Sequence, residues 1–203
     1  MKTRYKISIF LVVLGLISLV LPEKDNNVRR PVYAELLETI LSDTIEYSPD
    51  EVAKFMVNED TTIQLIDVRN REEFLDFNIP GAINIPFESL FDESYRGFLD
   101  QDQKRNILYS NGDILSNRAV ALLYLEGFRD NYVMKGGMNA WYENIMLSEF
   151  KGDRITPREN ALFETRYRAR KHFTRMNSLP DSLKMKYLEI KKEKEMELRG
   201  GCE

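Results

Sequence analysis

Apolar runs in the middle of the chain alternate with segments whose apolar positions recur every three to four residues. The runs are typical of buried strands, and the periodic segments are typical of helices. The expected strands are 44–48, 62–67, 83–85, 106–110 and 131–134. The expected helices begin at the capping sequences Ser48–Glu51 and Asn70–Glu73 and continue with 87–91, 116–126 and 137–141. This alternation predicts an α/β domain with a mostly parallel sheet.

The most apolar run of the chain, Ile7–Pro22, follows three basic residues near the N-terminus. As a helix it would be roughly 24 Å long, slightly shorter than the hydrocarbon core of a membrane. The basic end should stay in the cytoplasm, so we expect an inner-membrane anchor with the folded domain on the periplasmic side. The alternative is a secretory signal that is cleaved. Cleavage needs small residues at the cleavage site, and Val20–Pro22 are poor candidates for them.

The C-terminal part of the chain is highly charged and is expected to form helices at 157–176 and 181–198. The first carries six Lys or Arg residues against Glu159 and Glu164. Solvated helices are the simpler interpretation, and a basic face that docks on anionic lipid or a partner is the alternative. The expected organisation is an anchor or signal (1–22), a linker (23–43), the α/β domain (44–148) and a charged helical extension (149–203).

Composition excludes several classes of function. A net charge of −4 predicts no general affinity for nucleic acid. The chain has one cysteine, Cys202, and one histidine, His172, so an internal disulfide is impossible and a Cys/His metal site would lack ligands. We expect no metal and no other cofactor. A Ser-His-Asp triad would have to use His172, which stands outside the α/β motifs.

Three blocks of sequence resemble the rhodanese family in their order and spacing, and together they cover about half of the chain. The first joins Ile66–Arg69 and Glu73–Phe74 to Ile79–Pro86. The second runs from Asn106 to Phe128, and the third is Val133–Trp141. The resemblance implies a rhodanese-like parallel sheet flanked by helices, which is a sulfurtransferase fold used in sulfur metabolism.

Several residues of these blocks have a structural interpretation. Asp67 and Arg69 close a buried strand and can tie neighbouring loops together by charge-assisted hydrogen bonds. Pro80–Gly81 predicts a tight turn before a new strand. Gly136–Gly137 lets a strand turn sharply into a helix, and Trp141 is expected to pack back on the sheet.

The loop between Ser110 and Ser116 is the expected functional site. In active rhodaneses a cysteine at the end of this strand takes up sulfur as a persulfide, held by backbone amides and the N-terminus of the next helix. Ser110 occupies that position here, because Gly127–Phe128 then falls at the family's place without a gap. A serine hydroxyl cannot form a persulfide. Thiosulfate sulfurtransferase activity at this loop is therefore not expected.

Other residues also depart from the family pattern. Leu115 stands where an arginine is common, Asn78 stands where histidine is frequent, and Asp113 adds a negative charge that is expected to face an incoming anion. We expect the loop to bind a partner protein or a small sulfur-containing anion. Its residues are Ser110, Asn111, Gly112, Asp113, Ile114, Leu115 and Ser116.

The only thiol follows Gly200–Gly201, two residues that make a tail flexible. Cys202 could carry a persulfide, form a disulfide with another chain, or have no role. Two hypotheses follow: a catalytically silent binding module tethered to the membrane, which we favour, and a sulfur-relay component that uses Cys202 as carrier.

Overall fold

A computed structural model describes residues 46–101, 103–149 and 156–200. The described residues belong to one compact unit. The expected membrane anchor, the linker and Cys202 lie outside the described residues. Within those residues, no helix is both long enough and apolar enough to cross a membrane.

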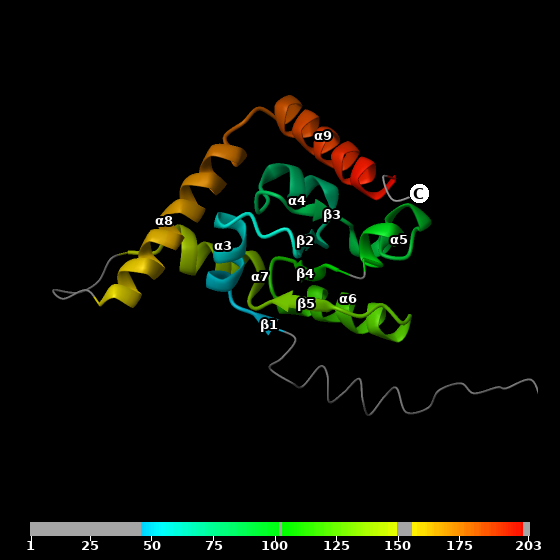
Figure 1. The fold of residues 1–203 in the computed structure, drawn as a ribbon, viewed down its shortest axis with the longest axis horizontal. Helices are drawn as coiled ribbons and strands as arrows, with labels where there is room; N and C mark the ends of the chain where they lie inside the picture. The colour runs from blue at the N-terminus through cyan, green and yellow to red at the C-terminus, as the bar shows by residue number, and fades with distance from the viewer. Residues whose placement is uncertain (1–45, 102, 150–155, 201–203) are drawn as a thin grey trace, which may run out of the picture. The chain divides into compact units, whose positions relative to one another are not determined.

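The centre of the fold is a parallel sheet with the strand order β1-β5-β4-β2-β3 (Figure 1). The strands are β1 (Glu46–Tyr47), β2 (Ile63–Asp67), β3 (Ile83–Asn84), β4 (Arg105–Tyr109) and β5 (Asn131–Met134). The five expected strands are therefore confirmed within the described residues. Asp67 at the end of β2 pairs in register with Tyr109 at the end of β4. Since the carboxyl ends of parallel strands meet at one edge, the residues that follow Asp67 lie beside those that follow Tyr109.

Helices join the strands. They are α3 (Pro49–Val57), α4 (Arg71–Asp76), α5 (Glu93–Leu99), α6 (Asp113–Leu125) and α7 (Gly137–Trp141), with a 3₁₀ turn at Phe87–Ser89 and a π-helical turn at Tyr142–Met146. The expected capping box at Ser48 is present, with Ser48 and Glu51 bonded to each other's backbone N–H groups. Asn70 caps α4 by accepting a hydrogen bond from the Glu73 N–H.

Two expectations need correction. Helix α5 was not predicted, because its residues show no clear apolar periodicity. Helix α6 begins at Asp113 and not at Ser116, so the functional loop is shorter than expected. Only Ser110–Gly112 separate β4 from α6.

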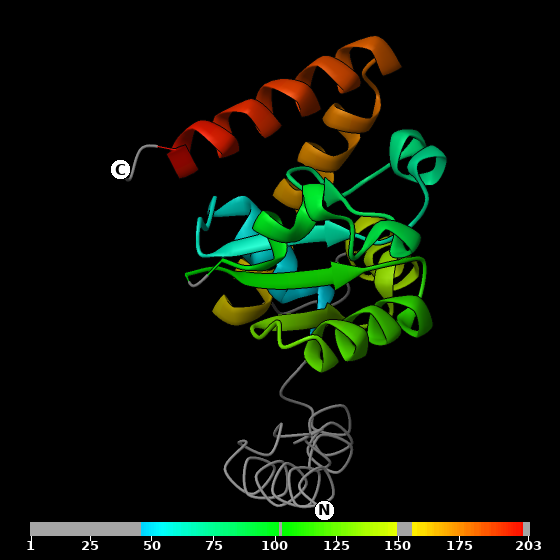
Figure 2. The same ribbon diagram turned by 90° about the vertical axis from the view of Figure 1, so that its right-hand side faces the viewer.

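The helices cover both faces of the sheet (Figure 2). On one face α5 and α6 pack on the sheet through Phe98, Leu99, Ala119, Val120 and Leu123. On the other face α3, α7 and the C-terminal helix α8 pack on sheet residues such as Leu65 and Ile107.

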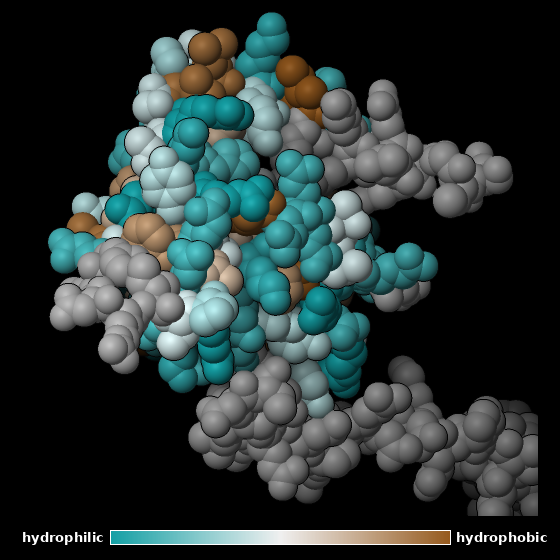
Figure 3. Space-filling model, turned by 60° about the vertical axis from the view of Figure 1, so that its left-hand side comes forward, coloured by the Kyte–Doolittle hydropathy of each residue, from teal (hydrophilic) through white to brown (hydrophobic). Residues whose placement is uncertain are grey.

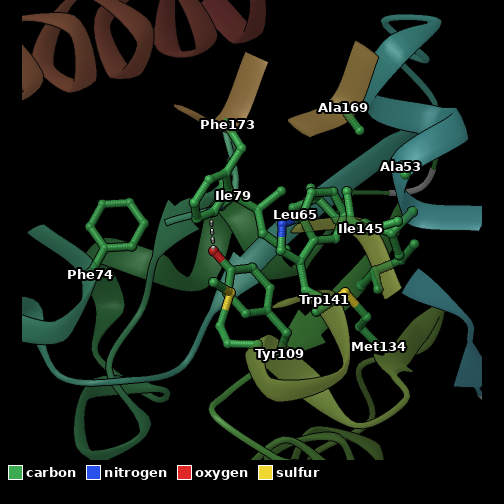
Figure 4. Packing of buried hydrophobic residues seen from close by; sticks show 14 residues of the cluster. Ala53, Leu65, Phe74, Ile79, Tyr109, Met134, Trp141, Ile145, Ala169 and Phe173 are labelled. Atoms are coloured by element: carbon green, nitrogen blue, oxygen red, sulfur yellow. Dashed lines mark hydrogen bonds between the residues drawn. The ribbon is translucent and has the colours of Figure 1, made fainter. Parts of the chain in front are cut away.

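Trp141 is fully buried at the centre of this second face, as expected (Figure 4). Its ring lies 6.3 Å from that of Phe173, a residue of α8. Tyr109 lies beside it, and its hydroxyl accepts a hydrogen bond from the Ile79 N–H at 3.2 Å. The C-terminal extension therefore contributes to the hydrophobic core.

The extension consists of α8 (Pro157–Asn177) and α9 (Asp181–Gly200), which confirms both predicted helices. Buried Ala169 and Phe173 show that α8 is not simply a solvated helix. Arg166 binds Asp50 of α3 through two hydrogen bonds of 2.6 Å. Helix α9 is held by Lys184, whose Nζ donates to the carbonyl oxygens of Leu75 and Asp76.

Candidate functional site

A buried ion pair lies at the carboxyl edge of the sheet. Asp67 and Arg69 are at most 1% exposed, and the Nη2 of Arg69 is 2.6 Å from the Oδ2 of Asp67. Burial raises the pKa of Asp67, and the bonds from Arg69 act against this rise. Burial disfavours the charge of Arg69, but its hydrogen bonds and Coulomb attraction to Asp67 outweigh that effect, so the pKa of Arg69 is raised. The raised pKa of Arg69 fits a structural pair held by charge, whereas the raised pKa of Asp67 shows that burial of this carboxylate outweighs its attraction to Arg69.

Arg69 also connects three segments, as the sequence predicted. Its Nη2 donates to the carbonyl of Phe77 at 2.8 Å, and its Nη1 donates to the Oδ1 of Asn111 at 3.3 Å. The guanidinium lies over the ring of Phe77, 5.1 Å from its centroid. The end of β2, the segment after α4 and the loop after β4 are therefore held together by one side chain.

Glu73 has a second role that sequence reasoning missed. It was expected to serve the cap of α4, but its Oε1 accepts a 2.5 Å hydrogen bond from the Nδ2 of Asn111. The side-chain amide of Asn111 is thus held at both ends, by Arg69 and by Glu73. No sequence signal indicated this contact, because Glu73 and Asn111 are brought together only by the pairing of β2 with β4.

Ser110 lies where β4 ends, and its hydroxyl is turned back into its own loop. The Oγ donates to the carbonyl of Gly112 at 2.6 Å, and the residue is 4% exposed. Among the described residues, no imidazole or carboxylate contacts this hydroxyl. A serine without an adjacent base is a weak nucleophile, so the geometry adds no activation to Ser110.

The turn between β5 and α7 is hydrogen-bonded to the loop after β4. The N–H of Met138 donates to the Ser110 carbonyl at 2.8 Å, and the N–H of Asn139 donates to the Asn111 carbonyl at 3.0 Å. Gly137 has a φ of +55°, and a Cβ there would lie 2.3 Å from the carbonyl oxygen of Ser110. Only glycine allows this approach, so position 137 requires glycine for its close contact with Ser110 as well as for the turn.

The expected orientation of Asp113 was wrong. Its carboxylate does not face the outside of the loop, because Oδ1 accepts a hydrogen bond from the backbone N–H of Gly136. The negative charge that the sequence placed against an incoming anion is instead used to join α6 to the β5–α7 turn.

The first turn of α6 keeps free backbone donors. The N–H groups from Asn111 to Leu115 have no acceptor among the described residues, and the Gly112 N-cap makes no side-chain hydrogen bond. Ser116 instead donates its hydroxyl to the carbonyls of Gly112 and Asp113. Successive free amides at a helix N-terminus favour a negatively charged group.

Exposed apolar side chains lie on the first turn of α6 and on the segment that Arg69 joins to the loop. Ile114 is 72% exposed and Phe77 is 43% exposed, whereas Leu115 packs partly into the core. The rim of the loop thus combines free N–H donors with exposed hydrophobic surface.

Comparison with known proteins supports one family. The rhodanese-like domain family matches residues 48–144. The thiosulfate sulfurtransferase GlpE of Shewanella oneidensis is 32% identical over 87 residues, which are 43% of this chain and 83% of that protein. The chain belongs to the rhodanese-like domain family.

The chain is also similar to two other proteins. A tRNA uridine(34) hydroxylase from Buchnera aphidicola is 28% identical over 113 residues, which are 52% of this chain and 35% of that protein. A solved structure from Bacillus halodurans is 20% identical, covers 65% of this chain and 97% of that chain, and superposes with a TM-score of 0.46. Helices α8 and α9 of this rhodanese-like protein lie beyond the family match.

The extension reaches the region of the rhodanese-like site. Asn78, at the place where the family often has histidine, donates its N–H to the Oδ1 of Asn177 at 2.9 Å. The Nδ2 of Asn177 returns a 2.9 Å bond to the carbonyl of Asn78. The segment that follows α4 is therefore bonded to Arg69 on one side and to α8 on the other.

Proposed function

We propose that this rhodanese-like domain is a binding module that is catalytically silent at the loop after β4. The observation that carries the proposal is the serine at the nucleophile position, whose hydroxyl is bonded to the Gly112 carbonyl. Uptake of sulfur as a persulfide requires a thiolate, and the loop offers none. The family fold is kept, and the reactive group is absent from it.

The proposed ligand of the loop is a partner protein that presents an acidic group beside an apolar side chain. The free N–H groups from Asn111 to Leu115 suit a carboxylate, and exposed Ile114 and Phe77 suit an apolar contact. A small sulfur-containing anion would use the same amides but would leave both hydrophobic side chains uncovered. The apolar rim therefore favours the protein.

The proposal includes a membrane tether formed by the apolar run Ile7–Pro22, with the domain on the periplasmic side. Fractionation of cells that produce the full chain tests this part. Recovery in the membrane fraction, with protease access from the periplasm, would support it. Recovery in the cytosol would contradict it.

A sulfur relay is the second candidate. The only thiol of the chain is Cys202, and one relative is named a thiosulfate sulfurtransferase. In this alternative the rhodanese-like domain docks thiosulfate, and the thiolate of Cys202 attacks its outer sulfur, so that the S–S bond of thiosulfate breaks, sulfite leaves and a persulfide forms on Cys202.

Intact mass spectrometry after incubation with thiosulfate separates the two candidates. The binding module predicts no gain of sulfur by the unchanged full chain and no difference for Cys202→Ser. The relay predicts a gain of one sulfur atom that Cys202→Ser abolishes.

A thiol restored to the loop tests whether the loop still cradles an anion. In the Cys202→Ser background, Ser110→Cys is expected to gain sulfur from thiosulfate, because the N–H groups around position 110 stabilise anionic sulfur. Ser94→Cys is the matched control, since it adds an exposed thiol on α5. Equal labelling of both variants would show that the loop amides have no special affinity for anions.

A further inference from the structure

Two adjoining cavities lie between α3 and the C-terminal helices. Helix α3 lies within the family match, whereas α8 and α9 lie beyond it. Their volumes are about 320 Å³ and about 510 Å³. Both are lined by Met56, Glu59 and His172, so they form one continuous groove, which we call the α3–α8 groove. These volumes fall within the range of about 300–1,000 Å³ that is usual for small-molecule sites.

The smaller compartment is mainly apolar. Its walls include Phe55, Ile63, Leu65 and Tyr187. Asp60 also lines it, but the carboxylate accepts hydrogen bonds from the N–H and hydroxyl of Thr62, at 2.9 and 2.7 Å. Its charge is therefore already engaged in a local turn, and the compartment suits an apolar group.

The larger compartment carries the charge. Arg168, Lys171 and Arg175 project from α8 at a spacing of three and four residues, which places them on one face of the helix. Within the described residues none of the three forms a salt bridge. Arg166 and Arg170 on the neighbouring face differ, since they bind Asp50 and Ser148.

Two carboxylates share this compartment with the three cations. Glu164 lies on α8 itself and Glu59 lies on the opposite wall. Neither is within salt-bridge distance of a described cation, so the donors of Arg168, Lys171 and Arg175 remain available. The balance of fixed charge is positive, and protonation of His172 would increase it.

The groove is distinct from the loop after β4. Strand β2 begins at Ile63, which lines the groove, and ends at Asp67, which supports the loop. Leu65 of the same strand also lines the groove, so the groove residue of β2 nearest to Asp67 lies two residues, about 7 Å, away from it. The side that carries α8 comes forward in Figure 3, where hydrophilic residues cover most of the surface and hydrophobic residues form small patches among them.

We propose that the α3–α8 groove binds a small anion with an apolar body, such as an aryl or alkyl carboxylate or phosphate. The apolar body occupies the compartment of Phe55, Ile63 and Tyr187. The anionic group binds Arg168 and Lys171, with Arg175 at its far side. The two compartments share Met56, Glu59 and His172, so one molecule can reach both.

Calorimetric titration of the full chain in neutral detergent, with empty micelles subtracted, tests this proposal. The probes are 4-phenylbutyrate and phenyl phosphate, and their comparison distinguishes a carboxylate from a phosphate. The uncharged 4-phenylbutanol and the cationic 4-phenylbutylamine control for the apolar body alone. We expect saturable binding of an anion and at least about tenfold weaker binding of the alcohol and the amine.

Charge reversal tests the location. Arg168→Glu with Lys171→Glu is expected to weaken anion binding by at least about tenfold. Arg158→Glu with Lys186→Glu is the matched control, because it makes the same charge change at exposed positions of α8 and α9 outside the groove. That control should bind as the unchanged protein does.

Three results would overturn the proposal. The first is no saturable binding of either anion up to about 10 mM, which is weaker than the affinities expected of a specific site. The second is equal binding of the anions and the alcohol, or equal loss in both charge-reversed pairs. The third is that a hexaglutamate peptide or anionic vesicles bind Arg168 and Lys171 while the small anions do not, which would make the surface a macromolecular contact.

Discussion

The Asp67–Arg69 pair and the charged residues of α8 use charge in different ways within one chain. Asp67 and Arg69 are buried, and they satisfy each other while Arg69 also bonds the loop and Phe77. On α8, Arg166 and Arg170 hold the helix to the domain, whereas other cations face a groove without a partner among the described residues. A buried charge must be paired to be tolerated, but a surface charge can remain available for a ligand.

The largest expected effect comes from breaking the buried pair. Arg69→Ala leaves the carboxylate of Asp67 buried without its partner and also removes the bonds to Phe77 and Asn111. We expect the free energy of unfolding to fall by about 3–5 kcal/mol. Urea unfolding measures the change. The exposed pair Lys135–Glu46 is the comparison, and Lys135→Ala should cost less than about 1 kcal/mol. Similar losses for both variants would remove the distinction.

The next largest effect tests whether the extension is part of the core. Phe173→Ala removes a side chain that is 8% exposed and packs near Trp141. We expect a loss of about 3 kcal/mol, because the change opens a cavity in the second face of the sheet. Tyr167→Ala, on the same helix but 50% exposed, should cost less than about 0.5 kcal/mol. A negligible effect of Phe173→Ala would mean that α8 adds little to the stability of the domain.

A smaller effect is expected where α9 meets α4. Lys184→Met keeps most of the apolar stem but removes the ammonium from the carbonyls of Leu75 and Asp76. The loss should be about 1–2 kcal/mol. Hydrogen exchange should increase at the amides of Met138 and Asn139, which donate to the carbonyls of Ser110 and Asn111, since Glu73 on α4 holds Asn111. Lys186→Met is the exposed control. If loop exchange did not change, the extension would not be coupled to the site.

The smallest effect concerns pH. Burial, together with nearby Arg175, lowers the pKa of His172 from its ordinary value, while Glu59 opposes the shift. The unfolded chain then binds a proton more readily than the folded chain, so stability rises with pH between the folded pKa and about 6.5. His172→Gln should remove this slope. The free energy of unfolding, measured across that range for both proteins, provides the test, and an unchanged slope would assign it to other groups.

The sequence predicted the order of the strands and helices well, because capping residues and apolar periodicity are local signals. Ser48 and Asn70 cap α3 and α4, as their positions in the sequence predicted. The start of α6 was predicted three residues late, because Asn111, Gly112 and Asp113 are typical turn residues and favour a longer loop. Helix α5 had no local signal of comparable strength.

The site was predicted only in part. The spacing of the blocks predicted Ser110 as the site residue, and the bonds of Arg69 to Asn111 and Phe77 tie the loops together as expected. The contacts of Glu73 with Asn111, of Asp113 with Gly136, and of Asn78 with Asn177 were not predicted. Each contact joins residues that are far apart in the sequence, and a single sequence contains no signal for such pairs.

By itself, the sequence determined that the chain carries a rhodanese-like α/β domain and that a charged helical extension follows, and it predicted that Ser110 stands in place of the loop cysteine. These properties depend on residue identity and local spacing. Only the tertiary structure decided that Asp113 points into the β5–α7 turn, that Phe173 belongs to the core, and that His172 lies in a groove with Met56. Those properties depend on which side chains the parallel sheet and its helices bring together, and packing over long sequence distances sets that arrangement.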